Sequence, residues 1–330
     1  MLLNKNSKVY VVCPANVATG GPELLHQLVY KLNIFGIEAY MYYYNTKKGK
    51  DPVHDEYKIY NNRYVESIDD NKNNLLIVPE VKTDLLYKYK SVQKVIWWLS
   101  VDNYFKSINS DSLKNKIKNL LKSVFYNYKP YKFDNNGIYH LVQSEYARQF
   151  LLNKGVEDDQ IKYLSDYINP RFIKNTQNSM ILKENIVAYN PQKGYEFTKK
   201  IIEKNKYSFK FVPIVNMSRQ QVAELLLKSK VYIDFGNHPG KDRIPREAAI
   251  SNCCVIVGKR GSAKYYEDVP ILEEFKFDFD ELLINDILDK INDCIINYEN
   301  NIKKFEGYRN FILSEEEKFE KDIKNIFKIN

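Results

Sequence analysis

"VYIDFGNHPGKDRIPREAAISNCCVIVGKRGSA" spans residues 231–263, and its pattern decides the fold of the chain. The apolar run 230–235 predicts a strand, "IPREAAIS" (244–251) predicts a helix, and "CCVIVG" (253–258) predicts a second strand. A strand that passes through a loop and a helix to a further strand is the building unit of a parallel sheet. The stretch therefore predicts an α/β fold whose loop lies at the carboxyl edge of a sheet, where such folds bind ligands.

Positive charge gathers in this loop, which holds Gly240, Lys241 and Arg243. Backbone N–H groups at the start of a helix favour an anion, and the two cationic side chains supply countercharge. The next predicted strand ends in a similar loop that contains Gly261 and Ser262. Two such loops at neighbouring strand ends predict a site for a diphosphate. The alternative is that the basic loop is merely solvated.

The same alternation of strands and helices runs through both halves of the chain. In the first half, strands are predicted at 8–13, 37–44, 74–78, 94–99 and 138–142, and helices at 22–36, 111–128 and 145–155. In the second half, strands at 185–189 and 209–215 and helices at 194–204 and 218–229 precede the quoted stretch, and 279–328 is helical and highly charged. This order predicts two α/β halves with separate sheets.

The composition is that of a folded globular protein. Of the 330 residues, 44% are hydrophobic and 28% are charged, which excludes a disordered chain. No apolar run approaches the roughly 20 residues that span a bilayer, and the first residues predict a strand rather than a signal peptide. The four cysteines lack metal-ligand spacing and indicate a reducing compartment. The net charge of +8 favours polyanionic partners.

The stretch from 218 to 263 resembles the nucleotide-sugar half of GT-B-fold glycosyltransferases, especially their large retaining group 1/4-type family. That family has a helix, a strand, a glycine-containing loop, a "P-x-E-A" helix start and an apolar strand that ends in a small-residue loop, and the order and spacing match here. The resemblance places the ribose-binding glutamate at Glu247 and the diphosphate-binding loop at Gly261 and Ser262. The family often has a second glutamate, which contacts the donor sugar, where this chain has Pro239. That role is therefore not carried over.

Two further segments are similar to the same family. "VAYNPQKGYEF" (187–197) resembles the first strand and loop of its nucleotide domain, which implies that Lys193 binds the diphosphate. "TGGPELLHQLVYKL" (19–32) resembles its amino-terminal glycine loop, where Gly20 and Gly21 would allow close approach of a phosphate or an acceptor.

The resemblance implies two Rossmann-like domains that face each other across a cleft, with a charged helical C-terminus. Residues 1–168 are expected to form the acceptor-side domain and residues 169–305 the nucleotide-sugar-binding domain. The polar stretch 165–180 looks like the linker between them. Residues 306–330 are expected to form a helix that packs back toward the first domain.

Asp102 follows an apolar run that begins at 95 and is the candidate catalytic residue. The resemblance implies a His or Asp that faces the donor sugar at this strand end, and a carboxylate could act as a general base or bind a sugar hydroxyl. The alternative is that Asp102 caps the following helix. His26 is expected to be a packed or surface residue. "FDFDE" (277–281) has the Asp-x-Asp pattern of metal-dependent transferases, but its place before a helix favours capping.

These observations predict a glycosyltransferase that moves a sugar from a nucleoside-diphosphate sugar to a glycan or lipid-linked acceptor, in cell-surface polysaccharide assembly. We expect no cofactor, no metal and no nucleic-acid partner. Two other classes stay open. One is a sugar-nucleotide epimerase of the same architecture, and the other is a non-catalytic protein that binds sugars or nucleic acid.

The expected helix 111–128 bears on where the protein acts. It has an apolar face, and its other positions carry Lys114, Lys116, Lys118 and Lys122. A basic amphipathic helix can lie in the headgroup layer of an anionic membrane, or its apolar face can pack on the sheet of the first domain. We expect a cytoplasmic protein, with peripheral association at the inner face of the membrane.

Overall fold

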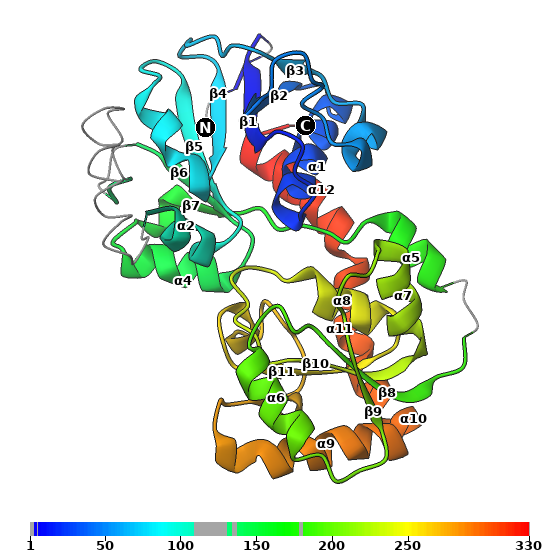
Figure 1. The fold of residues 1–330 in the computed structure, drawn as a ribbon. Helices are drawn as coiled ribbons and strands as arrows, with labels where there is room; N and C mark the ends of the chain where they lie inside the picture. The colour runs from blue at the N-terminus through cyan, green and yellow to red at the C-terminus, as the bar shows by residue number, and fades with distance from the viewer. Residues whose placement is uncertain (1–2, 5, 109–130, 134–136, 178–180, 330) are drawn as a thin grey trace. The chain divides into compact units, whose positions relative to one another are not determined.

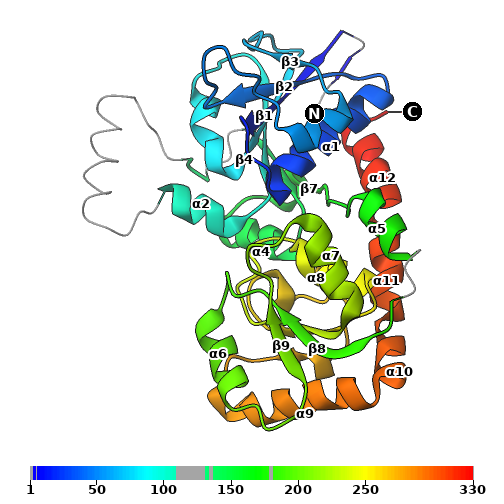
Figure 2. The same cartoon turned by 45° about the vertical axis from the view of Figure 1, so that its right-hand side comes forward.

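The computed structural model describes residues 3–4, 6–108, 131–133, 137–177 and 181–329. The chain divides into two compact units. Unit 1 comprises Met1–Gln143, Ala147–Ser165 and Lys318–Asn330, and unit 2 comprises Ser144–Tyr146 and Asp166–Glu317. Each unit has its own β-sheet with helices packed on it (Figure 1 and Figure 2). The predicted α/β fold with two separate Rossmann-like sheets is confirmed.

The sheet of unit 1 has seven strands in a doubly wound order. They are β1 (Lys8–Pro14), β2 (Glu38–Tyr44), β3 (Tyr64–Val65), β4 (Leu75–Pro79), β5 (Gln93–Trp98), β6 (Tyr139–Val142) and β7 (Ile161–Tyr163). Their order is β3-β2-β1-β4-β5-β6-β7, and all pairs are parallel. The order reverses between β1 and β4, and the carboxyl edge at such a switch point is where doubly wound sheets bind ligands.

The helices of unit 1 bury their apolar faces on this sheet. They are α1 (Gly20–Ile34), α2 (Val101–Ile108) and α4 (Glu145–Asn153), with the short 3₁₀ segments η1 (Asp55–Tyr60), η2 (Glu80–Tyr87) and η3 (Asp158–Gln160). Leu25, Leu28 and Leu32 of α1 are buried, as their helical spacing predicts. Residues 318–327 of α12 (Glu315–Phe327) lie beside α1 (Figure 1), where Lys31 Nζ is 2.6 Å from Glu320 Oε1.

The sheet of unit 2 has five strands. They are β8 (Glu184–Tyr189), β9 (Lys210–Pro213), β10 (Ser229–Asp234), β11 (Cys254–Gly258) and β12 (Lys276–Phe277). Their order is β12-β11-β10-β8-β9, again with parallel pairs throughout. Counted along the chain within this unit, the order is 2-1-3-4-5, the second common doubly wound arrangement, whose switch point lies between its first and third strands. These strands are β8 and β10.

Helices cover both faces of this sheet (Figure 1). On one face lie α7 (Arg219–Lys228) and α8 (Arg243–Ile250), with α5 (Pro170–Gln177) beside them, and on the other lie α6 (Tyr195–Glu203) and α9 (Ile284–Ile296). The chain continues through α10 (Tyr298–Asn301), η7 (Ile302–Phe305) and α11 (Glu306–Leu313) into α12. Ser218 begins α7 with a capping box, because its side chain accepts from Gln221 N and the Gln221 side chain accepts from Ser218 N.

Three expectations differ from the structure or lie outside it. The stretch 165–180 is not an irregular linker throughout, because Pro170 can occupy the first position of a helix without losing a hydrogen bond, and Phe172 and Ile173 of α5 pack on the core of unit 2. The chain returns to unit 1 at residue 318, not at 306. The expected helix 111–128 lies outside the described residues. Across the residues that are described, no helix is both long and apolar enough to cross a bilayer.

Candidate functional site

Three loops leave the carboxyl ends of β8, β10 and β11 at the switch point of unit 2. Gly194 joins the first loop to α6 with a positive φ of 62°, and Gly236 lies in the loop after β10. A Cβ on Gly194 would lie 2.1 Å from Phe235 O, and one on Gly236 would lie 2.4 Å from Lys193 Cβ. Only glycine permits both contacts, so these two loops are packed backbone against backbone.

The third loop, after β11, is fixed to the second in the same way. Gly261 has φ 60° and ψ −135°, and a Cβ there would lie 2.0 Å from His238 O. Ser262 then donates twice, from its N to His238 O at 2.8 Å and from its Oγ to Gly240 O at 2.6 Å. The predicted residues Gly240, Gly261 and Ser262 are therefore brought together.

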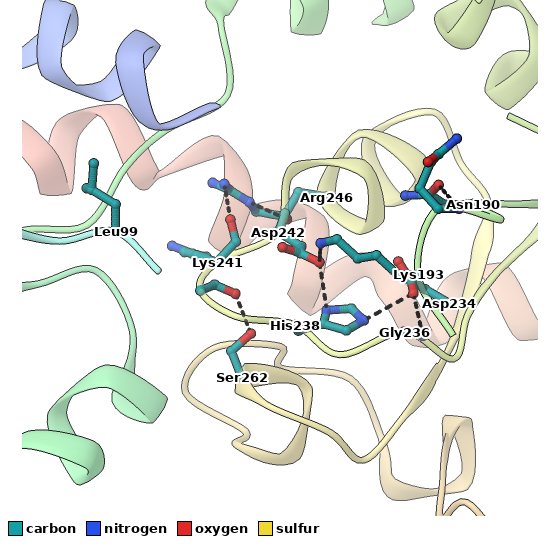
Figure 3. Close-up of polar contacts among 12 residues, drawn as sticks. Leu99, Asn190, Lys193, Asp234, Gly236, His238, Lys241, Asp242, Arg246 and Ser262 are labelled. Atoms are coloured by element: carbon teal, nitrogen blue, oxygen red, sulfur yellow. Dashed lines mark hydrogen bonds and ion pairs between the residues drawn. The ribbon is translucent and has the colours of Figure 1, made fainter. Parts of the chain in front are cut away.

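His238 stands at the centre of this framework (Figure 3). Its ring is fully buried, with Nε2 3.5 Å from Asp234 Oδ1 and Nδ1 3.6 Å from Asp242 Oδ2. Asp234 ends β10 and also accepts from Gly236 N at 2.9 Å, whereas Asp242 is the residue before α8. The ring thus lies between a carboxylate at the end of the strand and one at the start of the helix.

The electrostatics of this group favour a protonated ring. Burial lowers the pKa of His238, but the carboxylates of Asp234 and Asp242 outweigh burial and raise its pKa above the ordinary value for histidine. Burial likewise raises the pKa of Asp234, but the His238 ring and the Gly236 N–H outweigh it, and the net pKa is lowered. Both shifts have one cause, which is the position of the ring between the two carboxylates.

The same three side chains are the group that could hold a metal ion among the residues the structure describes. Each nitrogen of the His238 ring faces a different carboxylate, and a histidine binds one ion through one nitrogen. The Lys193 ammonium already lies 2.7 Å from Asp242 Oδ2, where it would repel a divalent cation. The arrangement suits a proton better than a metal.

Lys193 brings the loop after β8 onto this group. Its side chain remains about one third exposed, whereas that of Asp242 is 16% exposed. The ammonium thus reaches solvent, and an anion with more charge than a carboxylate could take the place of Asp242. Lys193 is the predicted diphosphate ligand, and its position at the switch point fits that role.

Lys241, by contrast, lies in a buried ion network. Its Nζ is 2.6 Å from Glu315 Oε1, and Arg246 holds the other oxygen of Glu315 at 2.8 Å. Arg246 also pairs with Asp166 and donates to Lys241 O at 3.0 Å. Two cations and two carboxylates balance here, which joins α8 to the start of α12. The charge of Lys241 is thus matched inside unit 2.

A cavity of about 750 Å³ lies beside α8 within unit 2. α5, α7 and α8 enclose it, and its lining includes Phe172, Arg219, Gln220, Arg243 and Glu247. Glu247 is 6% exposed and accepts from Arg243 Nε at 2.9 Å, so the arginine orients the carboxylate at the cavity wall. The volume is in the range of small-molecule sites.

In unit 1, Gly20 and Gly21 open α1 at the carboxyl end of β1. A Cβ on Gly20 would meet no atom within 4 Å, and one on Gly21 would make an ordinary contact of 3.5 Å with Leu99 Cδ1. Packing does not require glycine at either position. The space beside them is at the switch point of this sheet, as close approach of a ligand would need.

Asp102 lies in the first turn of α2. The alternative that it caps this helix is wrong, because Ser100 Oγ accepts from Asn103 N at 3.1 Å and is the capping group. Asp102 occupies the second helical position and stays the candidate catalytic residue.

Glu80 is a residue of unit 1 that sequence reasoning missed. It follows β4 at the switch point, is 2% exposed and accepts from Leu99 N at 3.0 Å. Burial raises the pKa of its carboxyl to about 7. Because Gln143 Nε2 donates to Leu99 O, both sides of the Leu99 backbone are held, and the turn from β5 into α2 is fixed three residues before Asp102. The sequence feature that could have indicated Glu80 is a charged residue directly after a fully apolar strand.

Two minor expectations are confirmed. His26 is packed, with Nδ1 2.8 Å from Pro22 O and Nε2 2.8 Å from Tyr43 Oη, and burial lowers its pKa to about 4. Asp280 is a cap, because its Oδ1 accepts from Leu282 N at 2.9 Å at the start of η6 (Glu281–Leu283).

No protein-family model and no curated protein sequence matches the chain. Solved structures match its fold. Sucrose-phosphate synthase from Thermosynechococcus elongatus is 10% identical with a TM-score of 0.69, over 98% of each chain. Anabaena Alr3699/HepE in complex with UDP-glucose is 11% identical with a TM-score of 0.57, over 97% of each chain.

A third similar structure is that of S. aureus TarM in complex with Fondaparinux, alpha-GlcNAc-glycerol and UDP. It is 15% identical with a TM-score of 0.52, over 79% of this chain. The present chain spans 56% of the length of the TarM chain. These matches show that the fold is that of the GT-B glycosyltransferases, as the sequence predicts.

We expect Gly261→Ala to destabilise unit 2 strongly. The added Cβ would lie 2.0 Å from His238 O in a backbone conformation that L residues rarely adopt, and such strain costs on the order of 1–3 kcal/mol before any clash is counted. Gly36→Ala is the matched control, because Gly36 also has a positive φ of 80° but nothing within 4 Å of the added atom. Urea unfolding measures both. Equal loss of stability in the two variants would contradict the packing described for the loop.

We expect stability to fall at high pH because of His238. A histidine whose pKa is raised by folding contributes stability that is fully present below its unfolded pKa, about 6.5, and is lost as the pH rises through the folded pKa. The free energy of unfolding should therefore decline above about pH 6.5, and more steeply in the wild type than in His238→Gln. Urea titrations from about pH 6 to 9 measure the two slopes. Parallel curves would mean that the ring is neutral.

Proposed function

We propose that the chain is a glycosyltransferase that transfers a sugar from a nucleoside-diphosphate sugar to a glycan or lipid-linked acceptor, in cell-surface polysaccharide assembly. The observation that carries the proposal is the framework at the switch point of unit 2. Three strand-end loops are fixed to one another around His238, Lys193 projects from the first, and α8 starts at the second. The fold, which glycosyltransferases share, supports the same function.

The proposed roles follow from position. The diphosphate would lie over the loops of Gly240, Gly261 and Ser262 with Lys193 as its countercharge, because backbone N–H groups and an ammonium stabilise phosphate oxygens. The nucleoside would enter the cavity beside α8, where Glu247, oriented by Arg243, would accept hydrogen bonds from the ribose hydroxyls. The Lys241 ammonium, paired with Glu315, would act indirectly by fixing α8.

The proposed reaction needs no divalent metal and no cofactor. As the donor sugar is transferred, charge develops on the departing diphosphate, and the fixed N–H groups and Lys193 would stabilise it in place of an ion. A screen of donor turnover across UDP-, GDP- and TDP-sugars, run in EDTA, tests function and metal use together. Turnover that appears only with manganese would refute metal independence, and tight nucleotide binding without any turnover would favour a binding protein.

We also propose that the protein acts at the cytoplasmic face of the membrane. The support comes from the sequence of 111–128 and from the lipid-linked acceptors that the proposed reaction can use. Salt-sensitive recovery with anionic vesicles in a flotation assay measures such peripheral association.

We expect Lys193→Ala and Glu247→Ala to weaken binding of the nucleoside diphosphate. The loss of a charge-assisted contact costs about 1.5–3 kcal/mol, or roughly ten- to a hundredfold in affinity. Lys199→Ala is the control, because Lys199 lies on α6, is exposed and pairs only loosely with Glu203 at 3.7 Å. Calorimetry measures all three. Glu247→Ala should also bind a nucleotide that lacks the ribose hydroxyls as well as the wild type does. Unchanged affinity in both site variants would refute the site.

We expect Asp102→Asn to lower turnover by more than tenfold while nucleotide affinity stays unchanged. The amide keeps the size of the side chain but can neither accept a proton nor carry charge, and Asp102 does not belong to the unit that holds the nucleotide site. Single-turnover kinetics and calorimetry on the same preparation separate the two effects. Wild-type turnover would remove Asp102 as the candidate catalytic residue.

A further inference from the structure

Unit 1 has a second cavity, of about 430 Å³, at the carboxyl ends of β2 and β3. Aromatic rings and ammonium groups line it, chiefly from Tyr42, Tyr43, Tyr64, Lys47, Lys48 and Lys50. None of these residues has a part in the nucleotide site. We call this cavity the lysine–tyrosine pocket.

The loop that carries the lysines is a built turn. Lys50 N donates to Lys47 O at 3.1 Å, and Gly49 turns the chain with a φ of 73°. Asn16, in the loop after β1, holds the far side of this turn, because its N donates to Pro52 O at 3.0 Å and its Nδ2 donates to Asp51 O at 2.9 Å. The pocket is thus fixed to the loop that leads into Gly20, at the switch point of this sheet.

The pocket carries excess positive charge. Within the part of the chain that the structure describes, the ammonium groups of Lys47, Lys48 and Lys50 have no carboxylate within 4 Å. The carboxylate of the neighbouring Asp51 lies 3.9 Å from the ammonium of Lys58. Glu66 is the one acidic residue in the lining. Three cations against one carboxylate favour an anionic ligand, and exposed charges of this kind act together and are weakened by salt.

The aromatic residues suit a sugar. Tyr64, on the edge strand β3, is 46% exposed, and its ring meets that of Tyr43 edge to face at 5.8 Å between centroids. Tyr43 is in turn held by His26, whose Nε2 lies 2.8 Å from the Tyr43 hydroxyl. Such rings offer an apolar face with a polar tip, against which the C–H face of a sugar ring can pack while its hydroxyls stay hydrated.

We propose that the lysine–tyrosine pocket binds an anionic glycan, with sugar rings against the tyrosines and carboxylate or phosphate substituents on the three lysines. The identification of this glycan as the acceptor rests on the proposed function. The glycan would lie one strand from the β1 switch point. A concave site with an aromatic wall favours a ring-shaped ligand over the flat headgroup layer of a membrane or an extended nucleic-acid backbone.

The test measures glycan binding to the full chain. The probes are a hyaluronan hexasaccharide for carboxylates, phosphorylated pentamannose for phosphates, and maltohexaose as the neutral control. We expect the two anionic glycans to bind, and maltohexaose to bind at least tenfold more weakly. The anionic glycan that binds better identifies whether the pocket prefers carboxylate or phosphate substituents. The combined variant Lys47→Gln, Lys48→Gln, Lys50→Gln should lose at least tenfold in affinity for the anionic glycans.

The matched control carries Lys72→Gln, Lys88→Gln and Lys90→Gln. These exposed lysines precede β4 and β5, at the amino edge of the same sheet, so the net charge changes equally but the pocket is intact. Its affinity should equal that of the wild type. Equal losses in the two triple variants would overturn the proposal, because the effect would then be one of net charge alone.

Tyr64→Leu separates a glycan site from a site for any polyanion. It should weaken binding of the anionic glycan severalfold and leave binding of tripolyphosphate unchanged. Tighter binding of anionic lipid vesicles or of an oligothymidine than of either glycan would overturn the proposal. Nucleotide affinity, measured beside each glycan titration, should stay at its wild-type value in all variants, so failure here is distinct from failure of the proposed donor site.

Discussion

The close approach of three loops at Gly194, Gly236 and Gly261 is the constraint on which the proposed nucleotide site depends. Each of these glycines lies where a Cβ would come within 2.4 Å of another loop. Backbone packed against backbone leaves little room for adjustment, so the loops form a rigid surface. Preorganised N–H groups on a rigid surface stabilise developing charge without reorganisation, as the proposed metal-independent reaction requires.

Charge within this framework is nearly balanced before any ligand arrives. His238 lies between Asp234 and Asp242, and Lys193 lies against Asp242. In the free protein the Asp242 carboxylate therefore neutralises the Lys193 ammonium, as a phosphate would in the proposed complex. In the proposed complex a diphosphate would displace Asp242 from Lys193, and the His238 ring, whose pKa the two carboxylates raise, would remain beside that carboxylate. The desolvated charge keeps a partner, so the exchange avoids the large cost of an isolated buried ion.

The sequence could predict this framework only in outline. Strand and helix periods place Gly240, Gly261, Ser262 and Lys193 at strand ends, because a parallel sheet brings all such ends to one edge. Periodicity cannot show that Lys241 pairs with Glu315, since the partners lie more than seventy positions apart and meet only through the tertiary fold. Residues 170–177 likewise look irregular by composition, and packing of Phe172 and Ile173 makes them helical.

Glu80 shows what a buried acid can contribute without touching a ligand. A carboxyl whose pKa lies near 7 is costly inside a protein unless backbone N–H groups meet it. Here the Leu99 N–H does so, and the amide of Gln143 holds the same residue from its carbonyl side. Burial of Glu80 is unfavourable, but its hydrogen bond from Leu99 N fixes the turn at the carboxyl edge of β5. This turn lies directly before the helix that carries Asp102. In unit 1, as in unit 2, buried charge fixes the position of the strand-end loop that carries the proposed function.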